Sequence, residues 1–175
     1  MEYLLFGARC ALAVTLAASA IGKLRAPGDF RRAVQDMDVV PDRLAGPVAG
    51  AVLAAETALI LLVWLPGPLG AVAFAAAAVL LAAFTAVLVA LIRRGSDVSC
   101  ACFGQSRTPV GAAHLVRNGA LLAIALLGAV AAAGGAGAAL PPELPAALAA
   151  AFAAAVVSAL LISTDTLVDL FSRPS

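Results

Sequence analysis

The chain has 175 residues, of which 63% are hydrophobic and 12% are charged, and its formal net charge at pH 7 is +1. This apolar content is far above the roughly 45–50% of an ordinary soluble domain, and the mean hydropathy of +1.06 predicts an integral membrane protein. The near-neutral charge argues against a nucleic-acid partner. Three cysteines are too few for a disulfide scaffold.

Apolar runs separated by proline, glycine and charged residues predict an all-α bundle that crosses the lipid bilayer. A span needs about 20 residues, so one membrane domain over residues 1–175 has room for about five spans and short loops. Four spans with a reentrant element are the alternative. The first run is interpreted as a span rather than a cleaved signal peptide, because Glu2 precedes it and Arg9 interrupts it. The predicted spans are residues 3–21, 48–65, 69–92, 110–133 and 146–163.

A polar segment, residues 27–44, separates the first two spans. Within it, Phe30, Ala33, Val34 and Met37 recur at helical spacing. This pattern predicts a short amphipathic helix that lies at the membrane interface.

Basic residues fall on one side of a five-span topology. The positive-inside rule then places the loop after the third span on the cytoplasmic side and the N-terminus outside. The residues that carry this bias are Lys23, Arg25, Arg31, Arg32, Arg43, Arg93, Arg94, Arg107 and Arg173.

That loop contains two cysteines, Cys100 and Cys102. On a helix they would point about 200° apart, but on an extended segment they share a face. A disulfide between them would be tight, and strained, exposed disulfides are the ones that exchange readily. Arg94, Arg107 and the N-terminal end of the next helix favour thiolate over thiol. The loop therefore predicts thiol redox chemistry; a soft-metal site, with only His114 nearby as a further ligand, or a structural role are the alternatives.

Three ionisable residues lie well inside predicted spans, namely Arg9, Glu56 and Arg117. Each costs at least ~2.5–3.5 kcal/mol on insertion scales, so such residues indicate function by default. Arg117 enters from the cysteine side and Arg9 from the other, so either could reach Glu56. Two interpretations stay open: an ion pair that fixes the bundle, or a polar pocket that holds a ligand head group or relays protons to the thiols.

Four further residues have competing interpretations. His114 is either bonded to a backbone carbonyl or acts as a base, and Asn118 follows Arg117 on the same helix. Cys10, alone in the first span, is either a small packing residue or a third thiol. Lys23, at the end of the first span, is interpreted as an interfacial anchor rather than a catalyst.

The chain resembles the DoxX-like redox-associated membrane proteins, and most closely the methylamine utilisation protein MauE family. The resemblance covers most of the chain. The residues that carry it are Gly22-Lys23-Leu24, the Phe30 segment leading to Pro41, Glu56, Cys100-Ala101-Cys102-Phe103-Gly104 and Arg117-Asn118.

The resemblance implies a multi-span bacterial inner-membrane protein that works with a thioredoxin-like partner during maturation of extracytoplasmic enzymes. The chain is also similar in plan to vitamin K epoxide reductase and bacterial disulfide-forming membrane proteins, in which a cysteine pair exchanges electrons with a quinone. It departs from them because Cys100 and Cys102 have one spacer residue and no second pair follows. The family also implies thiol chemistry toward the outside, whereas the basic residues place this loop inside.

The resulting prediction is a membrane thiol–disulfide oxidoreductase that passes electrons between a thioredoxin-like partner and a quinone or other membrane acceptor. Cys100 and Cys102 would be catalytic. The alternatives are an assembly or chaperone subunit that docks a thioredoxin-like protein without turnover, and a small transporter that uses the Glu56 pocket. The residues predicted to bind a quinone or shape its pocket are Glu56, His114, Arg117, Asn118 and Arg9.

Overall fold

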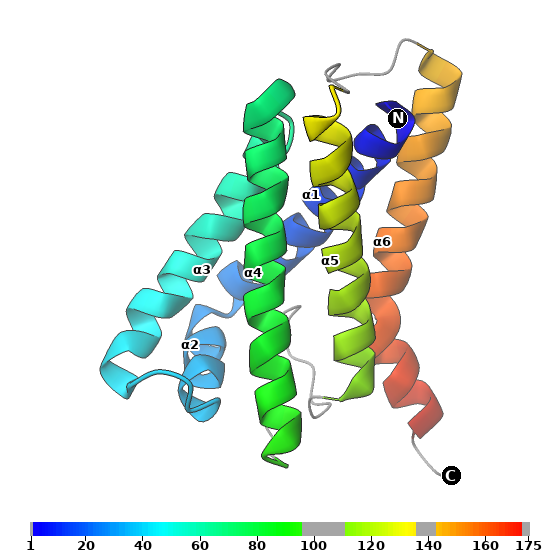
Figure 1. The fold of residues 1–175 in the computed structure, drawn as a ribbon. Coiled ribbons are helices and arrows are strands. Elements are labelled where there is room, and N and C mark those ends of the chain that lie inside the picture. Colours follow the sequence, from blue (N-terminus) through cyan, green and yellow to red (C-terminus); the bar gives the residue numbers. More distant parts are fainter. Residues whose placement is uncertain (1, 96–110, 136–142, 173–175) are drawn as a thin grey trace.

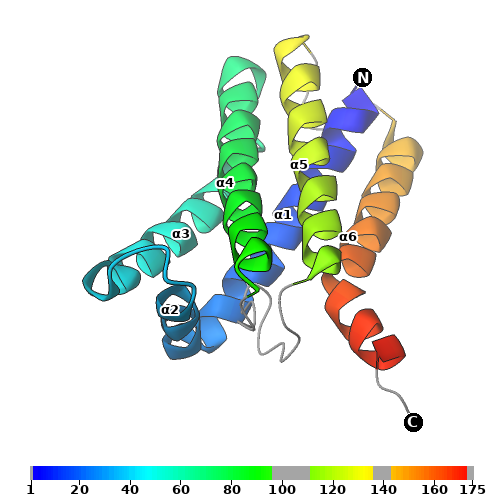
Figure 2. The ribbon, with the colours of Figure 1, turned by 60° about the horizontal axis from the view of Figure 1, so that its bottom comes forward.

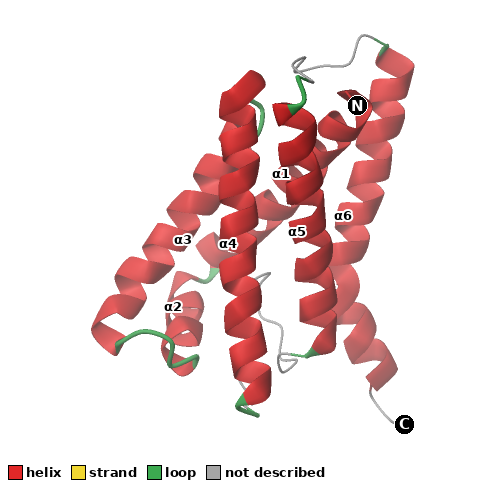
Figure 3. Ribbon diagram, viewed as in Figure 1, coloured by secondary structure: helices red, strands yellow, loops and turns green. Residues whose placement is uncertain are grey.

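The computed structural model describes the backbone of residues 2–95, 111–135 and 143–172, with side chains up to Ser163. These ranges form helices joined by turns (Figure 3). Five helices in them are long and apolar enough to cross a membrane, which confirms the predicted five-span helical bundle. The helices are α1 (Glu2–Arg25), α2 (Pro27–Asp36), α3 (Asp42–Leu62), α4 (Gly67–Arg93), α5 (Ala112–Ala133) and α6 (Leu144–Ser172).

The spans run alternately up and down, and α1 crosses the others obliquely (Figure 1). The N-terminus lies at the upper end in this view. Helix α2, the last turn of α4 and the first turn of α5 lie at the lower end, which we call the α2 end (Figures 1 and 2). Residues 96–110, which include both predicted redox cysteines, follow α4 and precede α5 in the chain and lie outside the described residues.

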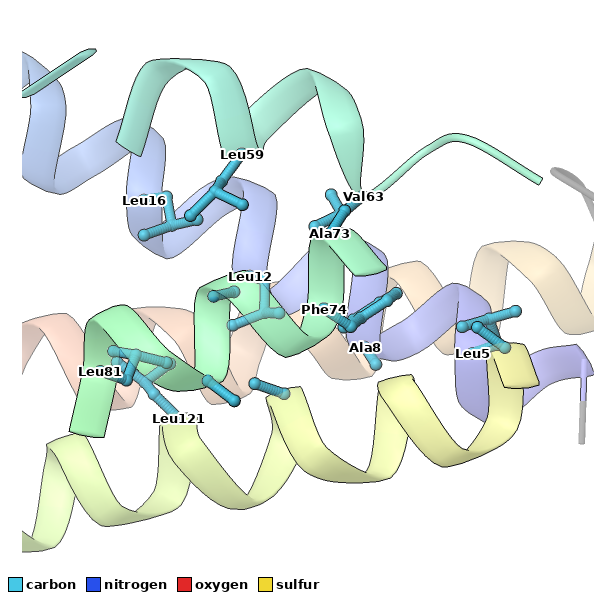
Figure 4. Close-up of a cluster of buried hydrophobic side chains, with 14 of the residues drawn as sticks. Leu5, Ala8, Leu12, Leu16, Leu59, Val63, Ala73, Phe74, Leu81 and Leu121 are labelled. Atoms are coloured by element: carbon cyan, nitrogen blue, oxygen red, sulfur yellow. The ribbon is translucent and has the colours of Figure 1, made fainter. Parts of the chain in front are cut away.

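Small residues let the helices pack closely around α1. Leucines of α1 pack against α3, α4 and α5, and alanines of α4 and α5 face one another in the same cluster (Figure 4). A methyl group on Gly128 of α5 would overlap the ring of Phe74 on α4. Close approach of this kind is how helices gain packing contacts in a bilayer, where no hydrophobic force holds them together.

The predicted amphipathic helix is present as α2. Its buried face consists of Phe30, Ala33 and Val34, while Arg31, Arg32 and other polar residues lie on the opposite side. The buried face packs against Ala45 and Ala49 of α3. Met37, the fourth residue of the predicted stripe, caps the C-terminal end of the helix. α2 begins where Pro27 disfavours helical geometry at Ala26, so the chain turns there before a new helix starts.

Several helix ends differ from the predicted spans; α1, for example, continues to Arg25 rather than ending at residue 21. α3 begins at Asp42 rather than at residue 48, because the helix continues through Pro47. Pro47 lies in the second turn of this helix, where proline removes the backbone hydrogen bond to the Arg43 carbonyl. α6 begins at Leu144 and continues to Ser172, past the predicted end of the last span.

Candidate functional site

A buried ion pair joins α1 to α3. The Lys23 ammonium donates to both carboxylate oxygens of Glu56, at 2.6 and 2.7 Å, and each side chain is 1% exposed. Ser19, one turn before Lys23 on α1, accepts a hydrogen bond from Lys23 Nζ at 2.7 Å and donates to Glu56 Oε1 at 3.2 Å. The Glu56 carboxylate therefore has its charge balanced inside the bundle, and Oε2 accepts one of these three hydrogen bonds.

The pairing corrects two predictions. Arg9 is not the partner of Glu56 that it was predicted it could be, and Lys23 is not the interfacial anchor that was predicted. Lys23 instead points into the bundle, because α1 continues to Arg25 and residues spaced by four share a helix face, so Ser19 and Lys23 face α3 together. The spacing of serine and lysine was the signal in the sequence that could have revealed the pair.

Aromatic rings cover the rest of the Lys23 ammonium. Nζ lies 5.0 Å from the ring centroid of Phe30 on α2 and 5.8 Å from that of Phe84 on α4. A cation over an aromatic face is attracted by the electron density of the ring, more strongly where water is excluded. One ammonium group thus contacts residues from α2, α3 and α4 in addition to its own helix.

Arg9, also on α1, has different partners from those of Lys23. Its Nε donates to the Val63 carbonyl at 2.9 Å, and its Nη2 donates to the Leu65 carbonyl at 3.2 Å. The last carbonyls of a helix have no partner within it, so the guanidinium completes the C-terminal end of α3. Arg9 therefore lies away from Glu56, and the expectation that it could reach this carboxylate is wrong.

The polar residues of α5 face α4 and the interior. Asn118 donates through Nδ2 to the Leu81 carbonyl at 3.0 Å and to the Thr85 hydroxyl at 2.9 Å. His114 is buried, and its Nδ1 accepts a hydrogen bond of 3.4 Å from the backbone N–H of Gly111. Arg117 is also buried, at 3% exposure. These contacts hold the start of α5 against α4.

A cavity of about 130 Å³ brings several of the predicted residues together. Helices α1 to α5 all contribute to its walls. Its polar end includes Ser19, Glu56, Arg117 and Asn118. The apolar walls include Phe30, Val34, Val48, Val52, Leu81, Phe84, Leu88 and Leu121. Of the five residues predicted to form the pocket, Glu56, Arg117 and Asn118 line this cavity, whereas Arg9 and His114 do not.

The cavity adjoins the part of the bundle that leads into the cysteine segment. Phe84 and Leu88 belong to the last turns of α4, and Arg117 belongs to the second turn of α5. The predictions for Cys100 and Cys102 fall outside the described residues. Cys10 is a free thiol, half-buried on α1.

The arrangement is that of a polytopic helical membrane protein with an ion pair and a partly apolar cavity inside its bundle. A family model described as methylamine utilisation protein MauE matches residues 1–131, and the chain belongs to this family. The matched residues include all five helices that line the cavity. The family resemblance inferred from the sequence is thereby confirmed.

A curated relative, the methylamine utilization protein MauE of Paracoccus denitrificans, is 36% identical over 124 residues. The match covers 70% of this chain and 66% of the relative, which is slightly less than two thirds of that protein's length. No solved structure matches the chain.

Proposed function

We propose that the protein is a membrane thiol–disulfide redox protein in which Cys100 and Cys102 alternate between a dithiol and a disulfide. A thioredoxin-like partner exchanges thiols with this pair. A thiolate of the partner attacks one sulfur and forms a mixed disulfide, and the second partner thiolate resolves it. The partner leaves oxidised, and Cys100 and Cys102 have gained its two electrons and two protons.

The cysteine pair then returns to the disulfide by passing two electrons and two protons to a membrane acceptor such as a quinone, which leaves as the quinol. Electrons and protons balance over the two half-reactions. Glu56 and Arg117 would shape the polar end of the acceptor's site, together with Asn118. Run in reverse, the same steps reduce the partner.

The position of the cavity in the bundle supports this proposal. It lies between the last turns of α4 and the first turns of α5, and Cys100 and Cys102 belong to the segment that connects these two helices in the chain. Its polar end holds buried ionisable side chains, of the kind that marks relay and substrate pathways inside membranes. The segment with the thiol pair is thus joined in the chain to two helices that line the candidate site for a membrane acceptor.

The biological setting follows from the relative. The Paracoccus denitrificans protein is named for methylamine utilization, and we infer that this chain serves the maturation of extracytoplasmic proteins in a comparable process. We place it in the bacterial inner membrane with the α2 end toward the cytoplasm. The supporting observation is that the exposed Arg31 and Arg32 on α2 and the exposed Arg93 at the end of α4 share this end (Figure 1).

Trapping the thiols tests the proposal. Cells are treated with membrane-impermeant or permeant alkylating reagents, with and without prior reduction, and modification of Cys100 and Cys102 is read by mass spectrometry. We expect two interconverting states, whose ratio shifts when the respiratory chain is blocked, and loss of the disulfide state when Cys100 or Cys102 is replaced by serine. A mixed disulfide should accumulate when the resolving thiol of the partner is replaced by serine. Cys10→Ser serves as the matched control and should leave the states unchanged.

The same variants separate the proposal from its alternatives. Maturation of the extracytoplasmic product should fail in Cys100→Ser and Cys102→Ser at normal membrane levels of the protein. Unchanged maturation in both variants would contradict redox cycling and favour an assembly subunit that docks its partner without turnover. Transport that depends on Glu56 but on neither cysteine would favour the transporter.

A further inference from the structure

The cavity that α2 helps to line has the size and chemistry of a ligand site. We propose that it binds a lipid-soluble compound whose single-ring head group carries hydrogen-bonding oxygens, with the head at the Glu56 end and the apolar tail toward α2. The quinone and quinol couple is the member of this class that the proposed function requires, so the inference rests on that function for its biological meaning. The binding site itself is argued from the cavity.

The size and walls of the cavity favour one flat ring. Its volume is about 130 Å³, and an engineered apolar cavity of about 150 Å³ binds benzene. The rings of Phe30 and Phe84 form part of the wall, and their centroids lie 5.0 and 5.8 Å from Lys23 Nζ. Aromatic rings pack well against other rings in offset or edge-to-face geometry.

The polar end offers both kinds of hydrogen-bonding partner. The Glu56 carboxylate can only accept hydrogen bonds when ionised, and the Arg117 guanidinium can only donate them. Both line the cavity, with the Ser19 hydroxyl between the carboxylate and Lys23. A ligand with ring carbonyls finds donors here, and its reduced form with ring hydroxyls finds an acceptor. Both forms are therefore accommodated by one set of residues.

We expect the ligand to enter the cavity from the lipid. Helix α3 diverges from α4 toward the α2 end (Figures 1 and 2), and α2 packs against α3 there. The cavity is partly open, and α2 and the following turn contribute Val34, Met37 and Val39 to its walls. These residues are apolar, so a prenyl or alkyl tail can lie along them without removing a polar group from water. A water-soluble ligand would gain nothing from such an entrance.

The test is photolabelling of the full chain in phosphatidylcholine nanodiscs. The probe is a fully substituted 1,4-benzoquinone with a short prenyl tail that bears a diazirine, and full substitution prevents addition of thiols to the ring. We expect labelling within residues 30–39, 48–56 and 81–88, and we expect an untagged benzoquinone of the same head group to compete. Labels concentrated on α6, or competition by excess phospholipid alone, would overturn the inference.

A pair of matched variants measures the affinity. Val52→Trp fills the cavity from α3, and we expect it to weaken probe binding by at least tenfold, which corresponds to about 1.4 kcal/mol. Val79→Trp introduces the same side chain on the outer face of α4, where Val79 is 70% exposed, and should leave the dissociation constant unchanged. Equal affinities in both variants would contradict the site. The competition on the unmodified chain decides the question if Val52→Trp does not fold.

Probe binding and thiol cycling can be tested independently of each other. The double variant Cys100→Ser/Cys102→Ser should bind the probe with unchanged affinity, because the site is argued from the described residues of α1 to α5. Probe binding without thiol cycling would leave this inference standing and refute the proposed redox function. Thiol cycling without probe binding would refute the inference and assign the electrons to another acceptor.

Discussion

Helix α1 carries two buried cations, Lys23 and Arg9, with different kinds of partner. Lys23 neutralises a carboxylate beside a cavity, whereas Arg9 binds two neutral backbone carbonyls at the end of α3. The comparison teaches that a charge inside a membrane protein does not by itself mark a ligand site. What distinguishes the functional candidate is the opposite charge and the cavity next to it.

The largest expected effect is that of separating the ion pair. Glu56→Gln or Lys23→Met leaves one buried charge without its partner, and such changes typically cost about 3–5 kcal/mol of stability. We expect both single variants to lower the free energy of unfolding in detergent by an amount in this range. Chemical denaturation followed by circular dichroism measures it.

The double variant Lys23→Met/Glu56→Leu sharpens this prediction. Replacing both charges by apolar residues of similar size is often neutral or stabilising, so the double variant should be more stable than either single one. It should also lose affinity for the reduced, hydroquinone form of the probe, since the carboxylate that accepts from the ring hydroxyls is gone. A double variant as unstable as the sum of the singles would show that the two side chains act independently.

Removing Arg9 should have a smaller effect than breaking the ion pair. Arg9→Met leaves the Val63 and Leu65 carbonyls without this donor but also removes a buried charge, and unsatisfied neutral groups cost about 1–3 kcal/mol. The free energy of unfolding should fall by about that amount. Probe binding should be unchanged, because Arg9 lies outside the cavity. Weakened probe binding in a folded Arg9→Met protein would undo the distinction between the two cations.

The apolar contact between Gly128 and Phe74 gives a comparison for the stability losses of the polar variants. Gly128→Ala places a methyl group against the Phe74 ring, and overpacking of this kind costs about 1–3 kcal/mol. Phe74→Leu in the same chain should recover part of the loss, because the smaller side chain leaves room for the methyl group. Thermal unfolding of the three variants measures the coupling, and strict additivity would contradict the contact.

The smallest expected effect is at Asn118. Its Nδ2 joins α5 to the Leu81 carbonyl and the Thr85 hydroxyl of α4. Side-chain hydrogen bonds between membrane helices contribute about 0.6 kcal/mol on average and at most about 1.7 kcal/mol. Asn118→Leu should therefore lower the free energy of unfolding by no more than this, with Thr85→Val as the matched control. A loss above about 2 kcal/mol would mean that Asn118 supports more of the α4–α5 interface than its two contacts indicate.

The number and type of the helices could be predicted from the sequence because the signals for them are local. Runs of apolar residues long enough to cross a bilayer indicate the spans directly, and Phe30, Ala33 and Val34 at helical spacing indicate α2. The prediction also recognised that Glu56 needs a partner, because a carboxylate inside a span is costly wherever the helix lies. The cost of burying a charge and the gain from burying an apolar run depend mainly on the residue itself and on its neighbours in the sequence.

The identity of that partner was decided only by the tertiary structure. Lys23 lies just past the end of an apolar run, so hydropathy alone places it at the membrane surface. The oblique path of α1 and the rotation that its packing imposes turn Ser19 and Lys23 toward Glu56 and bring Arg9 to the end of α3 (Figure 1). Helix tilt and rotation follow from contacts between residues far apart in the chain, and so does the cavity that five helices enclose. Spacing along α1 can put Ser19 and Lys23 on one face, but contacts between helices decide which helix that face meets.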